Sequence, residues 1–464
     1  MRPSYLGRIL LQWCDSCHVP VLAPACSCGA RTRPVPVTPP GDARPAFPAD
    51  VSLVNRIYEE HFGAPLIPAG HLALLNKVPD PDRMEEVIAG GAVLGSIRFL
   101  AGEGRWEPIP RREAAAYLAP RRRYVVVDTG AVPSIVNGGA SVLAPGLLEI
   151  EPSVKRGDEV FVLDEEKHCI AVGRAKVDAG EAAGMERGSI VRTRKNAPST
   201  CIPGKASWED AVNANAAVIG EKEAASVHFI REVAGRHPLP VNVSYSGGKD
   251  SLATLLLVRK ALGAVPLLFA DTGLELPETY ANVQEVAGRY GLPIVEVSGE
   301  EAFWETFSRE GPPAVNFRWC CRKAKLEPVK RAIGEHWGEC LSFVGQRQYE
   351  SFRRKAGRRV WRNPHVGNQV AAAPIQTWTA LHVWLYLFRE RAPYNILYEE
   401  GLDRVGCFMC PSSDRAVLER IRAMHPGLWE TWDRQLRYWQ RSHGLPDEWV
   451  VQEAWRMRGE APFQ

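Results

Sequence analysis

The sequence predicts an α/β protein in which a doubly wound parallel sheet is preceded by two smaller modules. Apolar strands alternate with helical segments beyond Pro238, as in parallel sheets that carry helices on both faces. Before them, short strands separated by glycine turns indicate a small β-barrel, and two close pairs of cysteines near the N-terminus indicate a zinc ribbon. A chain of 464 residues has room for about two to four such domains.

The composition is that of a globular protein, with 45% hydrophobic and 24% charged residues. The 57 basic and 54 acidic residues leave a formal net charge of +3, so the overall charge does not indicate nucleic-acid binding and any basic surface must be local. The sequence has no apolar run of about 18 residues and no secretory signal at its start, from which we expect a cytoplasmic protein without membrane contact. In such a protein the 11 cysteines are more often metal ligands or redox groups than disulfides.

Residues 1–46 are predicted to form a zinc ribbon. Two close cysteine pairs can reach one tetrahedral Zn²⁺, and so short a segment needs a metal to supply its folding energy. The expected ligands are Cys14, Cys17, Cys26 and Cys28. The second pair has one intervening residue instead of two, so His18 remains an alternative ligand. The proline-rich stretch that follows, to about residue 48, is predicted as a linker.

Residues 49–120 are predicted as a mixed α+β domain. We expect a helix over 51–62, a second short helix that begins over 84–88 and a strand over 91–99. This segment by itself indicates no chemistry.

Residues 121–195 contain short strands with glycine turns at regular spacing, which is typical of a small β-barrel. After a strand over 124–130, the stretches grouped in this way are 135–146, 147–151, 156–163 and 169–177. Their order resembles a PUA domain, and the residues that carry the resemblance are Gly138-Gly139, Ala144-Pro145-Gly146 and Arg156-Gly157-Asp158. The resemblance implies RNA binding, as in enzymes that modify tRNA and rRNA. A barrel used only for packing or protein contacts is the alternative. The segment before it is similar to the domain that often precedes PUA in archaeal proteins.

Residues 207–464 are predicted to hold the doubly wound sheet and a helical C-terminal tail. Ser207 and Asp210 begin the first helix in the manner of a capping box. The expected strands are 241–246, 265–271, 293–298 and 341–345, and the expected helices are 250–263, 277–290 and 322–337. In such sheets ligands bind at the carboxyl ends of the strands.

The stretch Ser-Gly-Gly-Lys-Asp-Ser over 246–251 joins the first strand of this sheet to its first helix. Paired glycines let backbone N–H groups approach an anion, and the start of the helix adds its partial positive charge. Lys249 supplies a cation, both serines can hydrogen-bond phosphate oxygens, and Asp250 can cap the helix or hold a metal ion. The spacing is not the Walker pattern but that of the shorter loop that holds the pyrophosphate of ATP in adenylating enzymes. The predicted phosphate site is Ser246, Gly247, Gly248, Lys249, Asp250 and Ser251, and the alternative is a simple strand–helix turn.

The second strand of the sheet ends in Asp271-Thr272-Gly273. Because this end lies beside the phosphate loop in a doubly wound sheet, Asp271, Thr272 and Gly273 are expected at the nucleotide, with the carboxylate on Mg²⁺ or the ribose. Glu275, before Pro277, either belongs to the site or caps the following helix.

Several ordered motifs together resemble the phosphoadenosine phosphosulfate (PAPS) reductase family over roughly residues 215–420. They are the loop 246–251, Asp271-Thr-Gly273, Pro277-Glu-Thr-Tyr280, the stretch from Gly345 to Arg353, and Pro374-Ile375 before Trp378. The resemblance implies a PP-loop fold of the adenine nucleotide alpha hydrolase type that binds ATP, adenosine phosphosulfate or its 3′-phosphate.

A second set of cysteines consists of Cys320, Cys321, Cys407 and Cys410. It resembles the ligands of the [4Fe–4S] cluster in adenosine phosphosulfate reductases, and four thiolates suit such a cluster. Zinc and a redox or structural thiol pair are the alternatives. The nearby Arg322, Lys323 and Lys325 would offset the negative charge of a cluster and face an anionic substrate.

An arginine-rich run extends over 347–362. Arginines hold phosphate or sulfate through paired hydrogen bonds, so Arg347 and Arg353 are expected to stabilise the negative charge that develops in the reaction. With Lys249 and Asp250 they form the predicted catalytic set. Three interpretations of the run remain: it closes over the nucleotide, it continues an RNA-binding surface from the PUA domain, or it is a solvated basic loop.

No cysteine follows Cys410, whereas assimilatory reductases of the family carry a cysteine nucleophile near the C-terminus. The region 425–455 is instead rich in tryptophan, which is more typical of helix packing than of base stacking.

The leading hypothesis is an RNA-directed enzyme, with tRNA as the expected RNA. Its phosphate loop would use ATP to adenylate a base oxygen, and an iron–sulfur cluster would handle sulfur from a donor protein. The first alternative is a PAPS or adenosine phosphosulfate reductase that uses an external thiol or electron donor. The second is a non-catalytic RNA-binding protein that senses a nucleotide.

Overall fold

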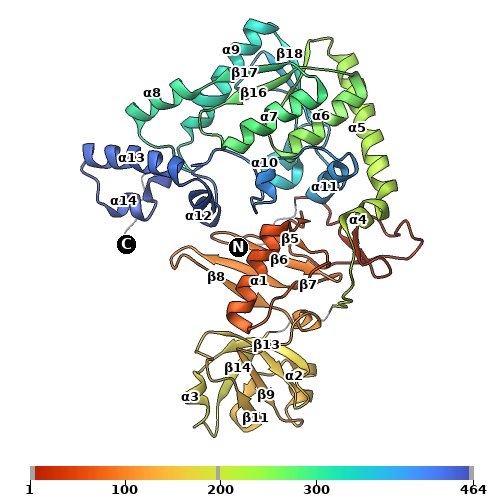
Figure 1. Cartoon of the computed structure of the whole chain (residues 1–464), viewed down its shortest axis with the longest axis vertical. Coiled ribbons are helices and arrows are strands. Elements are labelled where there is room, and N and C mark those ends of the chain that lie inside the picture. The colour runs from red at the N-terminus through yellow and green to blue at the C-terminus, as the bar shows by residue number, and fades with distance from the viewer. Residues whose placement is uncertain (1–5, 195–198, 459–464) are drawn as a thin grey trace. The chain divides into compact units, whose positions relative to one another are not determined.

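The computed structural model describes residues 6–194 and 199–458 (Figure 1). The chain divides into two compact units. The first comprises residues 1–218 with 399–401, and the second comprises residues 219–398 with 402–464. In the described ranges no helix is long and apolar enough to cross a membrane.

The first unit begins with a small antiparallel sheet in which β1 (Gln12–Cys14) lies between β2 (Val19–Val21) and β3 (Arg33–Pro34). Helix α4 (Trp208–Ala214) packs against β2 and starts at the predicted capping box, since the Ser207 hydroxyl accepts from the Asp210 N–H. After α4, the Asn215 amide accepts from Leu22 N at 2.8 Å and donates to Pro20 O at 2.9 Å. The cysteine-bearing hairpin is therefore fixed by a distant helix.

A five-stranded antiparallel sheet follows, with helix α1 (Pro48–Phe62) at the predicted position. In spatial order its strands are β4 (Arg44–Pro45), β5 (Leu74–Lys77), β6 (Met84–Ala89), β7 (Ala92–Leu100) and β8 (Arg105–Pro110). The prediction of a short helix that begins over 84–88 is wrong, because this stretch is the central strand β6. Most of its residues are helix formers, yet the stretch pairs with β5 and β7. Its buried Glu85 forms ion pairs with Arg44 of β4 at 3.0 Å and with the adjacent Arg83 at 2.9 Å. Long-range pairing overrides the local propensity here.

The predicted β-barrel is confirmed as a curved six-stranded sheet. In spatial order its strands are β10 (Val142–Leu143), β14 (Ser189–Thr193), β13 (Cys169–Ala175), β12 (Glu159–Leu163), β9 (Tyr124–Val127) and β11 (Leu147–Ile150). The pair β9–β12 is parallel and the other pairs are antiparallel. Grouping 135–138 with the strands is wrong, because these residues lie in helix α2 (Val132–Gly138). Pro133 favours the start of that helix, and Gly139 ends it at a φ of 59°.

The second unit contains the predicted doubly wound sheet. In spatial order its strands are β17 (Ile294–Ser298), β16 (Leu267–Asp271), β15 (Val241–Ser244), β18 (Cys340–Val344), β20 (Gln369–Ala372) and β19 (Val360–Arg362). All neighbours are parallel except β19 and β20. The order reverses at β15, which places the phosphate loop at the topological switch point.

Helices cover the sheet of the second unit (Figure 1). They are α5 (Ala216–Arg236), α6 (Lys249–Leu262), α7 (Pro277–Tyr290), α8 (Glu300–Glu310), α9 (Glu327–His336) and α11 (Ala380–Arg389). The helix expected over 322–337 has two parts, since the π-helix η3 (Cys321–Leu326) precedes α9. Short π-helical turns of this kind are frequent at functional sites.

Helix α12 (Arg415–Met424) precedes the tryptophan-rich region, which forms α13 (Pro426–Ser442) and α14 (Glu448–Val451). Trp429, Trp432 and Trp455 are buried in one apolar core with Phe303 of α8. The prediction that these aromatics pack helices is confirmed.

Candidate functional site

The loop between β15 and α6 is shaped by three glycines. Gly247 has a φ of 70°, and a Cβ there would lie 2.8 Å from a methyl carbon of Thr279. Gly248 is the N-cap of α6 and has no side-chain cap. Gly345, after β18, approaches so closely that a Cβ would lie 2.5 Å from the backbone of Asp250 and Ser251. The loop therefore presents backbone N–H groups at a helix start, which favours an anion.

A cavity of about 360 Å³ lies at the carboxyl ends of β15, β16 and β18. Ser246 and Ser251 of the loop line it, as predicted for phosphate ligands. Its charged lining residues are Glu275, Lys325 and Arg354. Its further lining includes Tyr245, Phe269, Gln346, Trp361, Asn363 and Gln369. Strands β19 and β20 bring the last three to the site, and no local pattern in the sequence indicated them.

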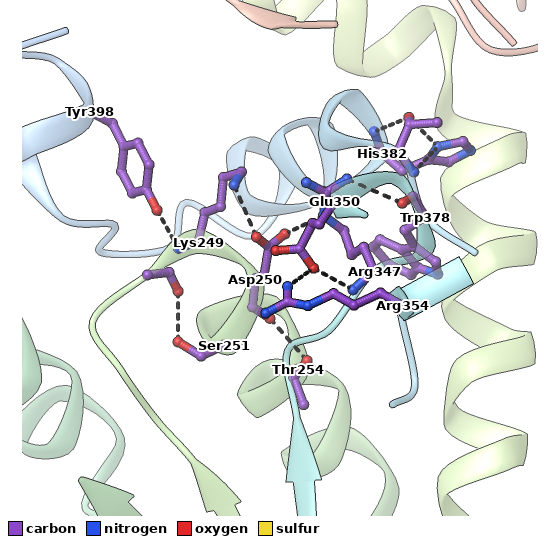
Figure 2. A network of polar contacts seen from close by, with 12 residues as sticks. Lys249, Asp250, Ser251, Thr254, Arg347, Glu350, Arg354, Trp378, His382 and Tyr398 are labelled. Atoms are coloured by element: carbon purple, nitrogen blue, oxygen red, sulfur yellow. Dashed lines mark hydrogen bonds and ion pairs between the residues drawn. The ribbon is translucent and has the colours of Figure 1, made fainter. Parts of the chain in front are cut away.

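Lys249, Asp250 and Arg347 form a buried ion network next to the loop (Figure 2). Asp250 accepts from Lys249 Nζ at 2.9 Å through Oδ2 and from Arg347 Nε at 2.7 Å through Oδ1. Burial alone would raise the pKa of Asp250, but the charges of Arg347 and Lys249 outweigh it and hold that pKa below its ordinary value. The pKa of Lys249 is raised because the attraction of Asp250 outweighs its burial. All three groups are therefore charged.

This network changes two of the predicted roles. Asp250 does not cap α6, because the helix has no side-chain cap and both carboxylate oxygens are held by cations. Arg347 is 3% exposed, and its guanidinium also contacts the Trp378 carbonyl at 3.4 Å. In this arrangement Asp250 and Arg347 position the loop.

Tyr398 hydrogen-bonds the phosphate loop, a contact that the sequence did not predict. Its hydroxyl oxygen accepts from the backbone N–H of Lys249 at 2.9 Å, although the two residues are 149 positions apart. The ring also faces the ammonium of Lys249 at 5.8 Å. A tyrosine so far along the chain gives no signal in the sequence around the loop.

The arginine-rich run separates into residues with different surroundings. Arg354 lines the cavity and forms an ion pair with Glu350, which accepts from the backbone N–H of Arg347 at 2.8 Å (Figure 2). Arg353, predicted at the reaction centre, is exposed on the short helix α10 (Phe352–Ala356). Helix geometry turns the neighbouring side chain toward the cavity instead.

Asp271 and Thr272 lie at the end of β16 as expected. Asp271 Oδ1 accepts from Gly273 N at 2.8 Å and from the Tyr280 hydroxyl, so this oxygen shapes the turn. Glu275 accepts from the Thr272 hydroxyl and lines the cavity. It does not cap α7, which begins after Leu276 without a side-chain cap. Burial raises the pKa of Glu275.

The four N-terminal cysteines converge in a single cluster. Cys14 Sγ and Cys28 Sγ are 3.7 Å apart, Cys17 Sγ and Cys26 Sγ are 3.9 Å apart, and all four sulfurs lie within 4.8 Å of one another. Zinc–sulfur bonds of about 2.3 Å in a tetrahedron require this spacing, so the donor set fits one Zn²⁺. His18 is outside this set, and its ring lies against Gly204.

The second set of cysteines is also brought together, but more widely. Cys320 and Cys321 stand at the start of η3, and a tight turn places Cys410 N 3.2 Å from Cys407 O. In the described part of the chain, no three of these four sulfurs lie within 4.8 Å of one another. Arg318 donates to Cys321 Sγ at 3.4 Å. The hydrogen bond from Cys320, together with Arg318 and Lys325, lowers the pKa of Cys321 to about 5.

The wide spacing bears on the metal. A single zinc ion holds its sulfur ligands closer together than this set does, whereas a cluster of several metal ions requires separated thiolates. The donor set is all thiolate, and two cations accompany it. The residues therefore fit an iron–sulfur cluster better than one zinc ion.

Comparison with known proteins gives two domain matches. Residues 240–413 match the phosphoadenosine phosphosulfate reductase domain, and residues 123–196 match the PUA domain. The protein MJ0066 of Methanocaldococcus jannaschii is 39% identical over 98% of both chains. Sulfate adenylyltransferase subunit 2 of Photorhabdus laumondii is 31% identical over 42% of this chain and 74% of the relative. Adenosine 5′-phosphosulfate reductase 2 of Bacillus subtilis is 30% identical over 36% of this chain and 72% of the relative.

Proposed function

The chain belongs to the phosphoadenosine phosphosulfate reductase family and carries a PUA domain, and on this premise we propose that it is an RNA-modifying enzyme that binds an adenine nucleotide. The nucleotide occupies the cavity beside the phosphate loop, and the reaction transfers sulfur to an RNA base. We expect tRNA as the substrate.

One observation carries the proposal. The cavity is lined by Ser246 and Ser251 of the phosphate loop and also by Lys325 of η3, the π-helix that starts at Cys321. Thr272, at the end of β16, is 3.7 Å from Cys407 Sγ. A nucleotide held by the loop would thus have its phosphates near the second cysteine set, where sulfur chemistry is expected.

The proposed reaction has two steps. A carbonyl oxygen of the base attacks the α-phosphorus of ATP, the bond to the β-phosphate oxygen breaks, and pyrophosphate leaves. Hydrosulfide then attacks the activated carbon, the C–O bond breaks, AMP leaves with the base oxygen, and the base retains sulfur. No oxidant or reductant is consumed when the sulfur arrives as sulfide.

The residues of the cavity have distinct roles in this scheme. The serines and loop N–H groups hold phosphate oxygens, while Lys325 and Arg354 offset the negative charge that develops. Asp271, at the end of β16, would hold a Mg²⁺ ion, which would offset the charge of the phosphates. The second cysteine set would hold an iron–sulfur cluster, which supplies a site for binding sulfide.

Each of the two units offers one surface for RNA. The PUA domain is the first, because PUA domains are RNA-binding modules. The second is the loop around α10, where Phe352 is 61% exposed and is followed by three cationic residues, Arg353, Arg354 and Lys355. An exposed aromatic ring with exposed arginines such as Arg353 and Arg358 suits a stacked base and its phosphates.

A second candidate is the reduction of adenosine phosphosulfate, which the name of the Bacillus subtilis relative favours. In it a thiolate attacks the sulfate sulfur, AMP leaves, and a second thiol releases sulfite while a disulfide forms. Residues 411–464 contain no cysteine, and in this candidate external thiols such as those of reduced thioredoxin attack the sulfur.

The experiment is anaerobic purification followed by two parallel assays. The RNA proposal expects iron and sulfide in the protein, and release of AMP and pyrophosphate from ATP that depends on tRNA and sulfide. Release of sulfite from adenosine phosphosulfate with reduced thioredoxin would contradict the RNA proposal and support the reductase candidate. ATP and RNA binding without either product would instead indicate a nucleotide sensor.

A matched pair of variants connects either activity to the cavity. Ser251→Ala removes a hydroxyl that lines the cavity and is expected to lower the rate at least about tenfold. Ser308→Ala removes an exposed hydroxyl that donates to Trp304 O within α8, and it should leave the rate unchanged.

A further inference from the structure

The C-terminal segment Glu453–Arg458 contacts the two loops that carry the second cysteine set. It includes the 3₁₀ turn η6 (Ala454–Arg456) and follows α14 directly. Trp455 anchors it in the apolar core, with its ring 5.4 Å from that of Trp432. This segment has no part in the nucleotide cavity.

Its first set of contacts is with the loop after Cys410. Arg456 Nε donates to the Pro411 carbonyl at 3.2 Å, and another nitrogen of the same guanidinium donates to the Ser413 carbonyl. One side chain therefore satisfies two backbone carbonyls within three residues of Cys410.

Its second set of contacts is with the loop before Cys320. Val315 N donates to Arg456 O at 2.8 Å, Asn316 Nδ2 donates to Arg458 O at 2.6 Å, and Arg458 N donates to Asn316 Oδ1 at 3.0 Å. The guanidinium of Arg458 also lies 4.0 Å from the centre of the Phe317 ring. These bonds end three residues before Cys320.

Glu453 fixes Arg456 in this position. Its side chain is nearly buried, and it pairs with Arg456 at 3.1 Å, Arg415 at 3.4 Å and Arg422 at 3.6 Å. A buried carboxylate shared by three arginines holds their geometry, because each guanidinium is drawn to the same two oxygens. The segment is consequently an ordered part of the second unit.

We propose that Glu453–Arg458 is a clasp that sets the spacing between the two cysteine loops, with Arg456 and Asn316 as positioning residues for the four thiols. The loops are far apart in sequence and come from different elements, so their separation depends on whatever bridges them. A cluster that four thiolates hold needs that separation to be constant. This inference rests on the proposed iron–sulfur function.

The test compares Arg456→Ala and Asn316→Ala with Arg441→Ala, which changes an exposed arginine on α13. Arg456→Ala leaves Glu453 paired with two arginines, so no isolated buried carboxylate is created. Asn316 is exposed, and its replacement is the milder change. The first readout is iron lost to a chelator from the loaded protein, and the second is the rate at which a thiol reagent labels the four cysteines in metal-free protein.

Both clasp variants are expected to lose iron and to be labelled about tenfold faster than the wild type, while Arg441→Ala matches the wild type. Unchanged rates in both clasp variants would overturn the proposal. If Arg456→Ala does not fold, the rates of Asn316→Ala decide alone. Wild-type protein without iron would defeat the proposed function, whereas iron in the wild type with unchanged variants would defeat only the clasp.

Discussion

Asp250 and Arg347 lie 97 positions apart in the sequence, yet Arg347 Nε donates to Asp250 Oδ1 at 2.7 Å inside the second unit. Lys249 pairs with the other carboxylate oxygen at 2.9 Å. One aspartate thereby connects the phosphate loop to the loop after β18. Because two cations share it, its charge is essential to both loops.

Replacing that carboxylate tests its importance. Asp250→Asn removes the buried carboxylate that pairs with both Lys249 and Arg347, which should lower the free energy of unfolding by about 3–5 kcal/mol. The free energy of unfolding is measured by urea titration with tryptophan fluorescence as the signal. Glu335→Gln, at an exposed position of α9, should change this free energy by less than about 0.5 kcal/mol. Equal stabilities of the two variants would contradict the ion network.

Position 345 has no room for a side chain beside the phosphate loop. A Cβ at this position would lie 2.5 Å from backbone atoms of Asp250 and Ser251, so Gly345→Ala should displace the phosphate loop. We expect nucleotide binding to weaken at least about tenfold and stability to fall by about 1–3 kcal/mol. Calorimetric titration with ATP checks the binding. Gly288→Ala, in helix α7 with open space around it, is the control and should be neutral or stabilising.

His382 makes the second unit sensitive to acid. Burial, with the nearby charges of Lys222 and Arg347, lowers its pKa to about 3 in the folded chain. Its ordinary value of about 6.5 applies to the unfolded chain, so between these values only the unfolded state binds the proton. Stability from this group is complete above about pH 6.5 and falls by about 1.4 kcal/mol per unit as the pH decreases.

The measurement is the unfolding free energy of the wild type and of His382→Gln from pH 7 to pH 4.5. The wild type should lose about 2.3 kcal/mol relative to the variant between pH 6.5 and pH 4.5, because the unfolded histidine is already half protonated at pH 6.5. Parallel curves would show that this histidine is not held neutral.

The N-terminal cysteines should hold one zinc ion. Cys26→Ser removes one of four sulfurs that lie within 4.8 Å of one another, and the purified variant should lose zinc and the thermal stability that zinc adds to the first unit. Metal analysis and melting curves give the result. Cys201→Ser, outside the cluster, is the matched control and should keep its zinc. Equal zinc contents would disprove the site.

Local patterns predicted the elements whose signals are local. The helix over 277–290 is found with the expected bounds, because Pro277 starts it and Gly291, with a φ of 62°, ends it. The parallel strands are found within two residues of their expected ends, since their apolar runs are buried on both faces. The division into four domains remains a prediction.

The parts that sequence reasoning missed depend on distant partners. Strand β6 has helix-forming residues and is stabilised as a strand by its pairing with β5 and β7 and by the ion pair between Glu85 and Arg44 of β4. Tyr398 reaches the phosphate loop from 149 positions away. Arg354, rather than Arg353, faces the cavity because the short helix α10 sets which side chain turns inward. The contacts of Arg44 with β6 and of Tyr398 with the phosphate loop join residues far apart in the sequence, so local patterns do not predict them.

The aromatic core around α13 has a practical consequence. Trp319, Trp432 and Trp455 are buried in the same core against which Cys320 and Cys407 pack. Any light-absorbing centre bound by those thiols would drain excitation energy from these indoles. The tryptophan fluorescence of the protein should therefore decrease as the centre is loaded and increase as it is lost, so that the emission intensity reports how much of the protein holds the centre.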